Sequence, residues 1–325
     1  MLKLKVTMNA KRLVPAAVMA VGFIASAGYA RQPDSVSFER PNEYKIIASN
    51  SPVRAFAVLN NVLWYATEEI LISQPLNTRN HQQFPRMGNI GSTGITSMMT
   101  DAAGRVWIGG AEGVAMRAGN NFTSYTTENG LPDNSITALT RGSGNEVWAG
   151  TKQGAARFRD GNWTAFTTEQ GLPSNNVTAM ATDSRGRIYI GTDRGIAVFD
   201  GTKFDVHNMR NGMSWNQVRA IGIEPNTDVV WAAVGDRDIN RYDGREWRQF
   251  MEIQAGITSI MNDTRRTYFG SADGILRFNG EEWVSDRNRH GIPVEQVFSM
   301  YRDSKGDLWF AMEKGVLCLS NPYRR

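Results

Sequence analysis

Short apolar runs alternate with polar turns along most of the chain, and the alternation repeats at a nearly fixed distance. Three clear copies are ITSMMTDAAGRVWIGGAEGV from Ile95, ITALTRGSGNEVWAGTKQGA from Ile136 and VTAMATDSRGRIYIGTDRGI from Val177. With weaker copies included, the repeats begin near 53, 95, 136, 177, 218, 257 and 297. A period of about 40 residues is typical of a repeat architecture in which each unit packs against the next.

Each repeat contains four runs that are suited to β-strands. In the copy from Val177, the first run is followed by a polar turn, by a second run that carries Tyr189, and by a third run ending at Phe199. An Asp-Gly or Asn-Gly pair then leads to a fourth run that opens with an aromatic residue, and this pair favours a hairpin turn. Four hairpin-linked strands in about forty residues describe one blade of a β-propeller. We therefore expect an all-β, seven-bladed propeller of four-stranded antiparallel blades over residues 38–325.

The ends of the repeat series indicate how the ring would close. The copy that begins at Val297 has 29 residues, so its fourth run is missing, whereas the 11-residue segment 42–52 (NEYKIIASNSP) precedes the first copy. An open ring would expose strand edges that favour aggregation. We therefore expect 42–52 to complete the last blade, with Tyr44 or Phe38 as its leading aromatic residue.

The first 30 residues have the composition of a secretory signal. They contain four basic residues and no acidic one, followed by an apolar run, and small residues permit cleavage after Ala27 or Ala30. We expect a cleaved signal peptide over 1–30 and a periplasmic or secreted bacterial protein. An uncleaved membrane anchor is the alternative, because a run of about 18 apolar residues could span a bilayer.

Removing this segment changes the charge balance. The whole chain carries a formal charge of +4, but without the segment 32 basic side chains face 32 acidic ones. A generally basic surface of the kind that binds nucleic acid or anionic lipid is therefore not expected. We expect no nucleic-acid partner and no stable membrane insertion.

Residue types that carry catalysis or metal binding are sparse. Cys318 is the only cysteine, which excludes an internal disulfide and a multi-thiolate metal site. The histidines at 81, 207 and 290 lie far apart and lack metal-ligand spacing. We expect no cofactor, no metal site and no catalytic residue. A propeller-type lyase or hydrolase is the weakest alternative, and it requires His207 or His290 to meet a carboxylate in a shared cleft.

The copies resemble the two-component regulator propeller repeat, whose pattern runs roughly V-T-x-(I/M/L)-x-x-D-x-x-G-x-(L/I/V)-W-I-G-T-x-x-G-(L/I/V). VTAMATDSRGRIYIGTDRGI, VFSMYRDSKGDLWFAMEKGV and the connecting NGLPDNS and QGLPSNN carry the resemblance, which extends over about 38–325. It implies a periplasmic sensing propeller of the kind found in hybrid histidine kinases, which often recognises glycans or other small ligands. Only SNPYRR follows Leu319, so we expect any kinase to be a separate membrane protein.

The loops that join a fourth strand to the next first strand are uneven, and irregular loops on a regular scaffold are common sites of recognition. Trp215 lies in one of them, at a place where the sister loops carry Asp133 and Ser174. An exposed tryptophan there would suit stacking on a sugar or contact with a protein partner. The alternative is a ring that folds down over the edge of a blade.

Charged residues near the same loops complete the candidate set. Thr is the second residue of the first run in four copies, but Arg54 and Arg219 replace it in two others. Each arginine could clamp an anion, although an inter-blade salt bridge is the simpler expectation. The candidate ligand- or partner-binding residues are Trp215, Arg219, Arg54, Asp193, Arg194, Asp236 and Arg237.

These observations lead to one main functional hypothesis and two alternatives. We expect an exported, non-catalytic recognition or sensor module that binds a glycan, a small ligand or a protein on its loop face. A scaffold for an envelope protein complex is the first alternative. The lyase or hydrolase is the second.

Overall fold

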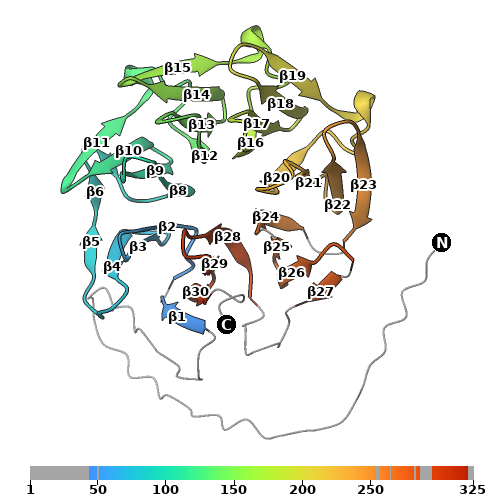
Figure 1. The fold of residues 1–325 in the computed structure, drawn as a ribbon. Helices are drawn as coiled ribbons and strands as arrows, with labels where there is room; N and C mark the ends of the chain where they lie inside the picture. Colours follow the sequence, from blue (N-terminus) through green and yellow to red (C-terminus); the bar gives the residue numbers. More distant parts are fainter. Residues whose placement is uncertain are drawn as a thin grey trace, which may run out of the picture. The chain divides into compact units, whose positions relative to one another are not determined.

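The structure is a computed structural model that describes residues 44–49, 51–253, 256–263, 265–281, 283–285 and 295–320. These residues form seven four-stranded antiparallel sheets that surround a central axis (Figure 1). The innermost strands of successive blades contact one another around the ring. The predicted seven-bladed propeller is therefore confirmed.

The strands of each blade follow one another along the chain, from the axis to the rim, and only the last blade departs from this order. Blade 1 holds β2 (Ala55–Leu59), β3 (Val62–Ala66), β4 (Leu71–Pro75) and β5 (Gln82–Phe84). Blade 2 holds β8 (Ser97–Thr100), β9 (Val106–Gly110), β10 (Gly113–Ala118) and β11 (Asn121–Tyr125). Blade 3 holds β12 (Ile136–Arg141), β13 (Val147–Thr151), β14 (Gly154–Arg159) and β15 (Asn162–Phe166). Blade 4 holds β16 (Val177–Thr182), β17 (Ile188–Thr192), β18 (Gly195–Phe199) and β19 (Phe204–His207).

Blade 5 holds β20 (Val218–Ile223), β21 (Val230–Val234), β22 (Asp238–Tyr242) and β23 (Trp247–Glu252). Blade 6 holds β24 (Ile257–Asn262), β25 (Thr267–Ser271), β26 (Gly274–Phe278) and β27 (Trp283–Ser285). Blade 7 holds β28 (Val297–Arg302), β29 (Leu308–Met312), β30 (Gly315–Leu319) and β1 (Tyr44–Ala48). A two-stranded ribbon, β6 (Arg86–Met87) and β7 (Ile90–Gly91), links blades 1 and 2.

The outer strand of blade 7 comes from the N-terminal side of the chain. β1 runs antiparallel to β30, with Tyr44 opposite Leu319 and Ala48 opposite Gly315. Backbone bonds continue the contact, since Ser49 N donates to Lys314 O and Val53 N donates to Met312 O. The edge of the last C-terminal strand is thereby covered.

A tryptophan in the second strand is tied to the turn before it. In blade 2, Trp107 is fully buried, and its Nε1 donates to Asp101 Oδ2 at 2.7 Å. In blade 5, Glu224 takes the place of the aspartate and accepts from Trp231 Nε1 at 2.9 Å. A buried indole N–H usually finds such a partner. In blades 2, 5 and 7 the bond joins the core tryptophan to the first turn, whereas Nε1 of the buried Trp148 in blade 3 has no hydrogen-bond partner.

Threonine at the second position of a repeat joins neighbouring blades. Thr178 Oγ1 donates to Val218 O of the next blade at 2.8 Å and also lies 3.1 Å from Gly191 O. The same inter-blade bond joins Thr96 to Ile136 and Thr258 to Val297. The fourth such residue, Thr137, has a buried hydroxyl with no hydrogen-bond partner. Three of the four repeated threonines therefore have a structural role between blades.

A glycine in the second strand packs against the first residue of the next blade. A Cβ on Gly191 would lie 2.6 Å from Val218 Cγ1, which is closer than real contacts allow. The same relationship holds between Gly109 and Ile136, Gly150 and Val177, and Gly270 and Val297. The glycine after the aromatic residue of the repeat thus sets how closely blades pack.

The predicted signal peptide, 1–30, lies outside the described residues, as do residues 42, 43 and 50 of the predicted closing segment and Phe38. Within the described part of the chain, no helix is long and apolar enough to cross a bilayer.

Candidate functional site

The fold separates the connections of the propeller into two sets. The loops from a fourth strand to the next first strand lie on the same face as the hairpins between second and third strands, and we call it the loop face. The hairpins between first and second strands and between third and fourth strands lie at the opposite ends of the strands, on what we call the turn face. Trp215 belongs to the loop face because it lies in the loop that connects β19 with β20.

Three loops on the loop face share one backbone structure. They contain the short 3-10 helices η1 (Thr127–Asn129), η2 (Thr168–Gln170) and η3 (Met209–Asn211). Each helix has a capping box and ends at a glycine with positive φ, namely Gly130, Gly171 and Gly212. An asparagine further along each loop accepts from the first helical N–H at 2.8 to 2.9 Å. Loops held by so many internal bonds are pre-organised for contact.

The third loop keeps this backbone but changes the exposed chemistry. Met209 replaces the threonine that opens the first two helices, and Trp215 replaces Asp133 or Ser174. Both side chains face solvent, with exposed fractions of 53% for Met209 and 55% for Trp215. Met213, in the same loop, is buried. The exposure on which the binding interpretation of Trp215 depends is thus observed. We call Met209, Arg210 and Trp215 the blade 4/5 patch.

Trp215 lies against a glycine of the next blade. A Cβ on Gly235 would approach the indole atoms Cγ and Cδ1 at 2.9 Å, so the ring packs directly over this backbone. Gly235 N donates to Gln217 O at 2.8 Å, which ties the loop to the hairpin between β21 and β22. The ring is therefore seated on one side while its other surface stays exposed.

Arg219 joins this cluster, but not as an inter-blade bridge. Its Nε donates to Gly235 O, and its guanidinium pairs with Asp236, a residue of the same blade. The expectation of an inter-blade salt bridge is wrong for Arg219, because the hairpin after β21 is one residue longer than the corresponding hairpins of blades 3, 4, 6 and 7 and brings Asp236 within reach. Trp215, Arg219 and Asp236 are thus brought together.

The other predicted residues lie elsewhere on the loop face. Arg54 pairs with Glu68 of its own blade at 2.7 Å, and its guanidinium carbon lies 4.3 Å from the ring centre of Phe298 in blade 7. The inter-blade contact of Arg54 is therefore a cation–π contact rather than a salt bridge.

Three predicted residues lie in hairpins between second and third strands. Arg194 and Arg237 are exposed at hairpin tips. Asp193 is half-buried, and its Oδ1 is a buried oxygen without a hydrogen-bond partner.

Sequence reasoning missed Met209 and Arg210. Both can be found by aligning the three loops on their glycines, because Met209 and Arg210 replace Thr127 and Glu128 of the first loop. The substitutions change an acidic polar surface into an apolar and basic one.

His207 does meet a carboxylate, as the enzymatic alternative requires. Its Nε2 lies 3.6 Å from Asp205 Oδ2, and its ring packs against Tyr242 and Trp247. Burial lowers the pKa of His207, although the charge of Asp205 acts in the opposite direction. His207 is on the outer strand β19 and lines neither cavity described below, while His290 lies outside the described residues.

Two cavities of about 440 Å³ each are present in the described structure. One lies in the central channel, between innermost strands, and is lined by apolar and hydroxyl side chains such as Phe56, Met98 and Thr182. The guanidinium of Arg141 in blade 3 donates hydrogen bonds to Thr100 of blade 2 in this wall. The second lies on the turn face between blades 5 and 6. No cluster of metal-ligating side chains occurs among the residues that the structure describes.

Comparison with known structures shows the same fold in proteins of low sequence identity. The extracellular domain of a putative hybrid two-component system from B. thetaiotaomicron has a TM-score of 0.70 and 16% identity, over 86% of this chain and 42% of that one. Virginiamycin B lyase from Staphylococcus aureus has a TM-score of 0.69 and 15% identity, over 85% and 99% of the two chains. YCF48 bound to D1 peptide has a TM-score of 0.67 and 14% identity, over 88% and 99%.

At the level of sequence, a comparison with curated proteins finds no match. The chain spans about two fifths of the two-component system domains that it resembles. The family model for the two-component regulator propeller matches residues 171–194 and 291–314, which cover the second-strand regions of blades 4 and 7. The resemblance seen in the repeats is thereby confirmed, and the chain is a seven-bladed propeller that carries two-component regulator propeller repeats.

Proposed function

We propose that the chain is an exported, non-catalytic recognition module of the sensor type, which binds its target on the loop face through the blade 4/5 patch. The observation that carries the proposal is the pair of exposed apolar side chains, Met209 and Trp215, on a loop whose backbone is fixed by a capping box. More than half of each side chain is exposed to water, although Trp215 packs against Gly235 on one side, and tryptophan is enriched at binding hot spots.

The neighbourhood of the patch defines the chemistry of the target. Arg210 is exposed on the same loop as Trp215, and Arg237 is exposed on the hairpin against which the ring packs. Arg219 is neutralised by Asp236. A target that combines an apolar or ring-shaped surface with acidic groups would therefore fit best. This description includes a glycan, a small ligand or a protein segment, and YCF48, which shares the fold, has been observed with a peptide.

Signal transmission would require a second protein. We propose that binding is relayed to a separate membrane sensor kinase, since the extracellular domain of a putative hybrid two-component system shares the fold. An envelope scaffold without a small ligand is the alternative. His207 lines neither cavity, and its outer-strand position favours recognition over acid–base catalysis.

The test uses a variant that carries the chemistry of the sister loops. Met209→Thr with Trp215→Asp should keep the loop backbone, because the sister loops hold the same conformation with these residues. Affinity-tagged wild type and variant are used to capture partners from an envelope fraction, and a glycan and small-ligand library is screened by thermal shift. A ligand that binds only the folded state raises the wild-type midpoint.

We expect a captured protein or a midpoint shift that the variant loses. The control is Thr127→Ala with Asp133→Ala in the first loop, which should retain binding. Equal binding by the wild type and the Met209/Trp215 variant would refute the role of the patch. A stability loss of several kcal/mol in Trp215→Ala would identify Trp215 as a core residue instead.

A further inference from the structure

Two turns of unequal length border the cavity on the turn face. The turn between β20 and β21 has six residues (Glu224–Val229), whereas the turn between β24 and β25 has four (263–266). The corresponding turns of blades 2, 3, 4 and 7 have five residues each. The turn of blade 1 has only two residues, and the cavity lies between the long turn of blade 5 and the short turn of blade 6.

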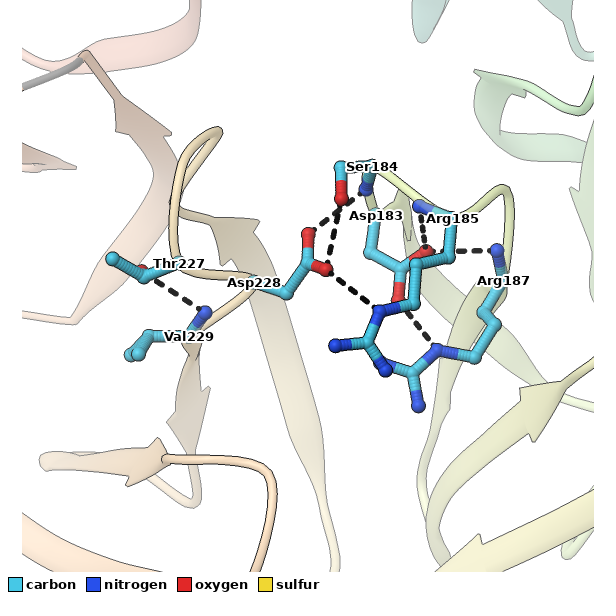
Figure 2. Close-up of polar contacts among 7 residues, drawn as sticks. All are labelled: Asp183, Ser184, Arg185, Arg187, Thr227, Asp228 and Val229. Carbon is cyan, nitrogen blue, oxygen red and sulfur yellow. Dashed lines mark hydrogen bonds and ion pairs between the residues drawn. The ribbon is translucent and has the colours of Figure 1, made fainter.

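The long turn is held away from this space by blade 4. Asp228 accepts from Ser184 N and from Ser184 Oγ, both at 2.9 Å, and lies 3.4 Å from Arg185 Nε (Figure 2). The backbone of Asp228 has a positive φ of 56°, a conformation that non-glycine residues seldom adopt. The contact with blade 4 stabilises this geometry, so the opening toward blade 6 is a fixed feature.

Aromatic side chains form one wall of the cavity. Trp231 and Phe278 are buried, but Phe250 is 40% exposed. The ring centre of Phe250 lies 4.9 Å from that of Trp231 and 5.1 Å from that of Phe278, and both pairs are edge-to-face. An aromatic wall with an exposed ring can receive a flat ring of a ligand.

The charged lining is dominated by arginines. Arg241, Arg265 and Arg266 line the cavity together with two carboxylates, Glu224 and Asp263. The guanidinium carbon of Arg241 lies 5.6 Å from the ring centre of Trp231, so the cation and the aromatic wall are adjacent.

Both carboxylates are committed to the protein itself. Glu224 accepts from Trp231 Nε1 and from Thr227 Oγ1. Asp263 accepts from the backbone N–H groups of two turn residues and from the Tyr268 hydroxyl. Both carboxylates therefore already accept hydrogen bonds from structural donors, and Arg241 is the guanidinium beside the aromatic wall.

We propose that this cavity binds an aromatic carboxylate, with the ring against Phe250 and the carboxylate beside Arg241. A guanidinium next to an aromatic wall suits a flat anion, because the fork of N–H donors matches the two carboxylate oxygens. A volume of about 440 Å³ accommodates one or two fused rings. The site is distinct from the blade 4/5 patch, which lies on the opposite face.

The experiment is an isothermal titration of the protein with 2-naphthoate, at low ionic strength. We expect saturable binding of one molecule per chain. The neutral 2-naphthamide, which has the same ring, should bind about tenfold more weakly because it lacks the charge. Cyclohexanecarboxylate, which keeps the charge without an aromatic ring, should also bind more weakly. Equal binding of naphthoate and naphthamide would overturn the role of the arginines.

The matched variants are Arg241→Met and Arg157→Met. In blade 5, Arg241 stands opposite Trp231 in the strand register, as Arg157 stands opposite Trp148 in blade 3. Only Arg241 lines the cavity. Arg241→Met should weaken naphthoate binding about tenfold, whereas Arg157→Met should change it by less than about twofold.

A second pair of variants guards against misfolding. Phe250→Ala, which removes the exposed ring, should also weaken binding, while Trp215→Ala should leave it unchanged. Thermal unfolding of each variant checks its fold. The proposal is overturned if the wild type shows no saturable binding, or if Arg241→Met and Phe250→Ala bind naphthoate as the wild type does. It is equally overturned if Trp215→Ala abolishes naphthoate binding.

Discussion

Asp228 of blade 5 accepts two hydrogen bonds from a single residue of blade 4, Ser184, through the backbone N–H and the hydroxyl group. The contact joins two first turns that are 44 residues apart, and it fixes Asp228 in a left-handed conformation. We expect Asp228→Ala to lower the free energy of unfolding by about 1–3 kcal/mol, since both bonds and the Arg185 ion pair are lost. Urea denaturation measures the change. A double-mutant cycle of Ser184→Ala and Asp228→Asn isolates the coupling, and a coupling near zero would contradict the assignment.

The same contact predicts a response to acid. Burial would raise the pKa of Asp228, but hydrogen bonds from Ser184 and the charges of Arg185 and Arg187 outweigh it, and the pKa lies below its usual value. A carboxylate with a lowered folded pKa stabilises the protein above its unfolded pKa of about 4, and this stabilisation is lost as the pH falls through the folded value. Wild type should therefore lose more stability than Asp228→Asn between pH 5 and the acid transition. Parallel stability curves of the two proteins would exclude this role.

The inter-blade threonines offer a comparison of two identical substitutions. Thr178→Val removes a hydroxyl that donates to Val218 O, and it should cost about 1 kcal/mol. Thr137→Val removes a buried hydroxyl without a partner, so it should be neutral or stabilising. Thermal unfolding of both variants tests the difference. The interpretation fails if Thr137→Val is the more destabilising of the two.

Replacing a glycine of the second strand by alanine should destabilise the protein. In Gly191→Ala, the new Cβ would lie 2.6 Å from Val218 Cγ1, and blades 4 and 5 would have to separate. We expect a loss of about 1–3 kcal/mol from overpacking. Gly256→Ala, where a Cβ meets no atom within 4 Å, is the control and should change stability little. A tolerated Gly191→Ala would mean that the blade spacing is adjustable.

His207 should make stability depend on pH in the mildly acidic range. Burial lowers its pKa, so the unfolded chain binds a proton more readily than the folded one. Stability is therefore full above the unfolded pKa of about 6.5 and falls as the pH drops toward the folded value. His207→Gln should flatten the stability profile between pH 7.5 and 5.5, and His81→Gln controls for loss of a histidine elsewhere. A profile that His207→Gln leaves unchanged would contradict the prediction.

The fold could be predicted from the sequence because its signals are local and repeated. An aromatic residue such as Trp107 recurs in the second strand of all seven units, and hairpin pairs such as Asp160–Gly161 recur in four. The repetition averages out weak copies. The sequence singles out Trp215 for the same reason, since two sister loops define what an ordinary loop contains, but it leaves open whether the ring is exposed or folded over the blade. Residue types at matched positions carry this information.

The salt-bridge partners and the cavity depended on features that residue types do not encode. Arg219 pairs with Asp236 of its own blade because the hairpin after β21 is longer by one residue. The cavity depends on the turn of Asp228, which is bonded to blade 4. Turn lengths are visible in the sequence, but the direction of a turn is decided by contacts between blades. The sequence therefore predicts the propeller and singles out Trp215. It does not predict the contacts that form where neighbouring repeats differ.

The three capped loops place one backbone at successive positions along an arc of the ring. Because each loop is stabilised by its own internal bonds, its exposed residues can change without altering the others. Placing methionine and tryptophan in the first two loops would turn a single anchor into a row of equivalent anchors. A long or repetitive target could then engage several of them at once and gain avidity, so target length as well as target chemistry can be tuned by a handful of surface substitutions.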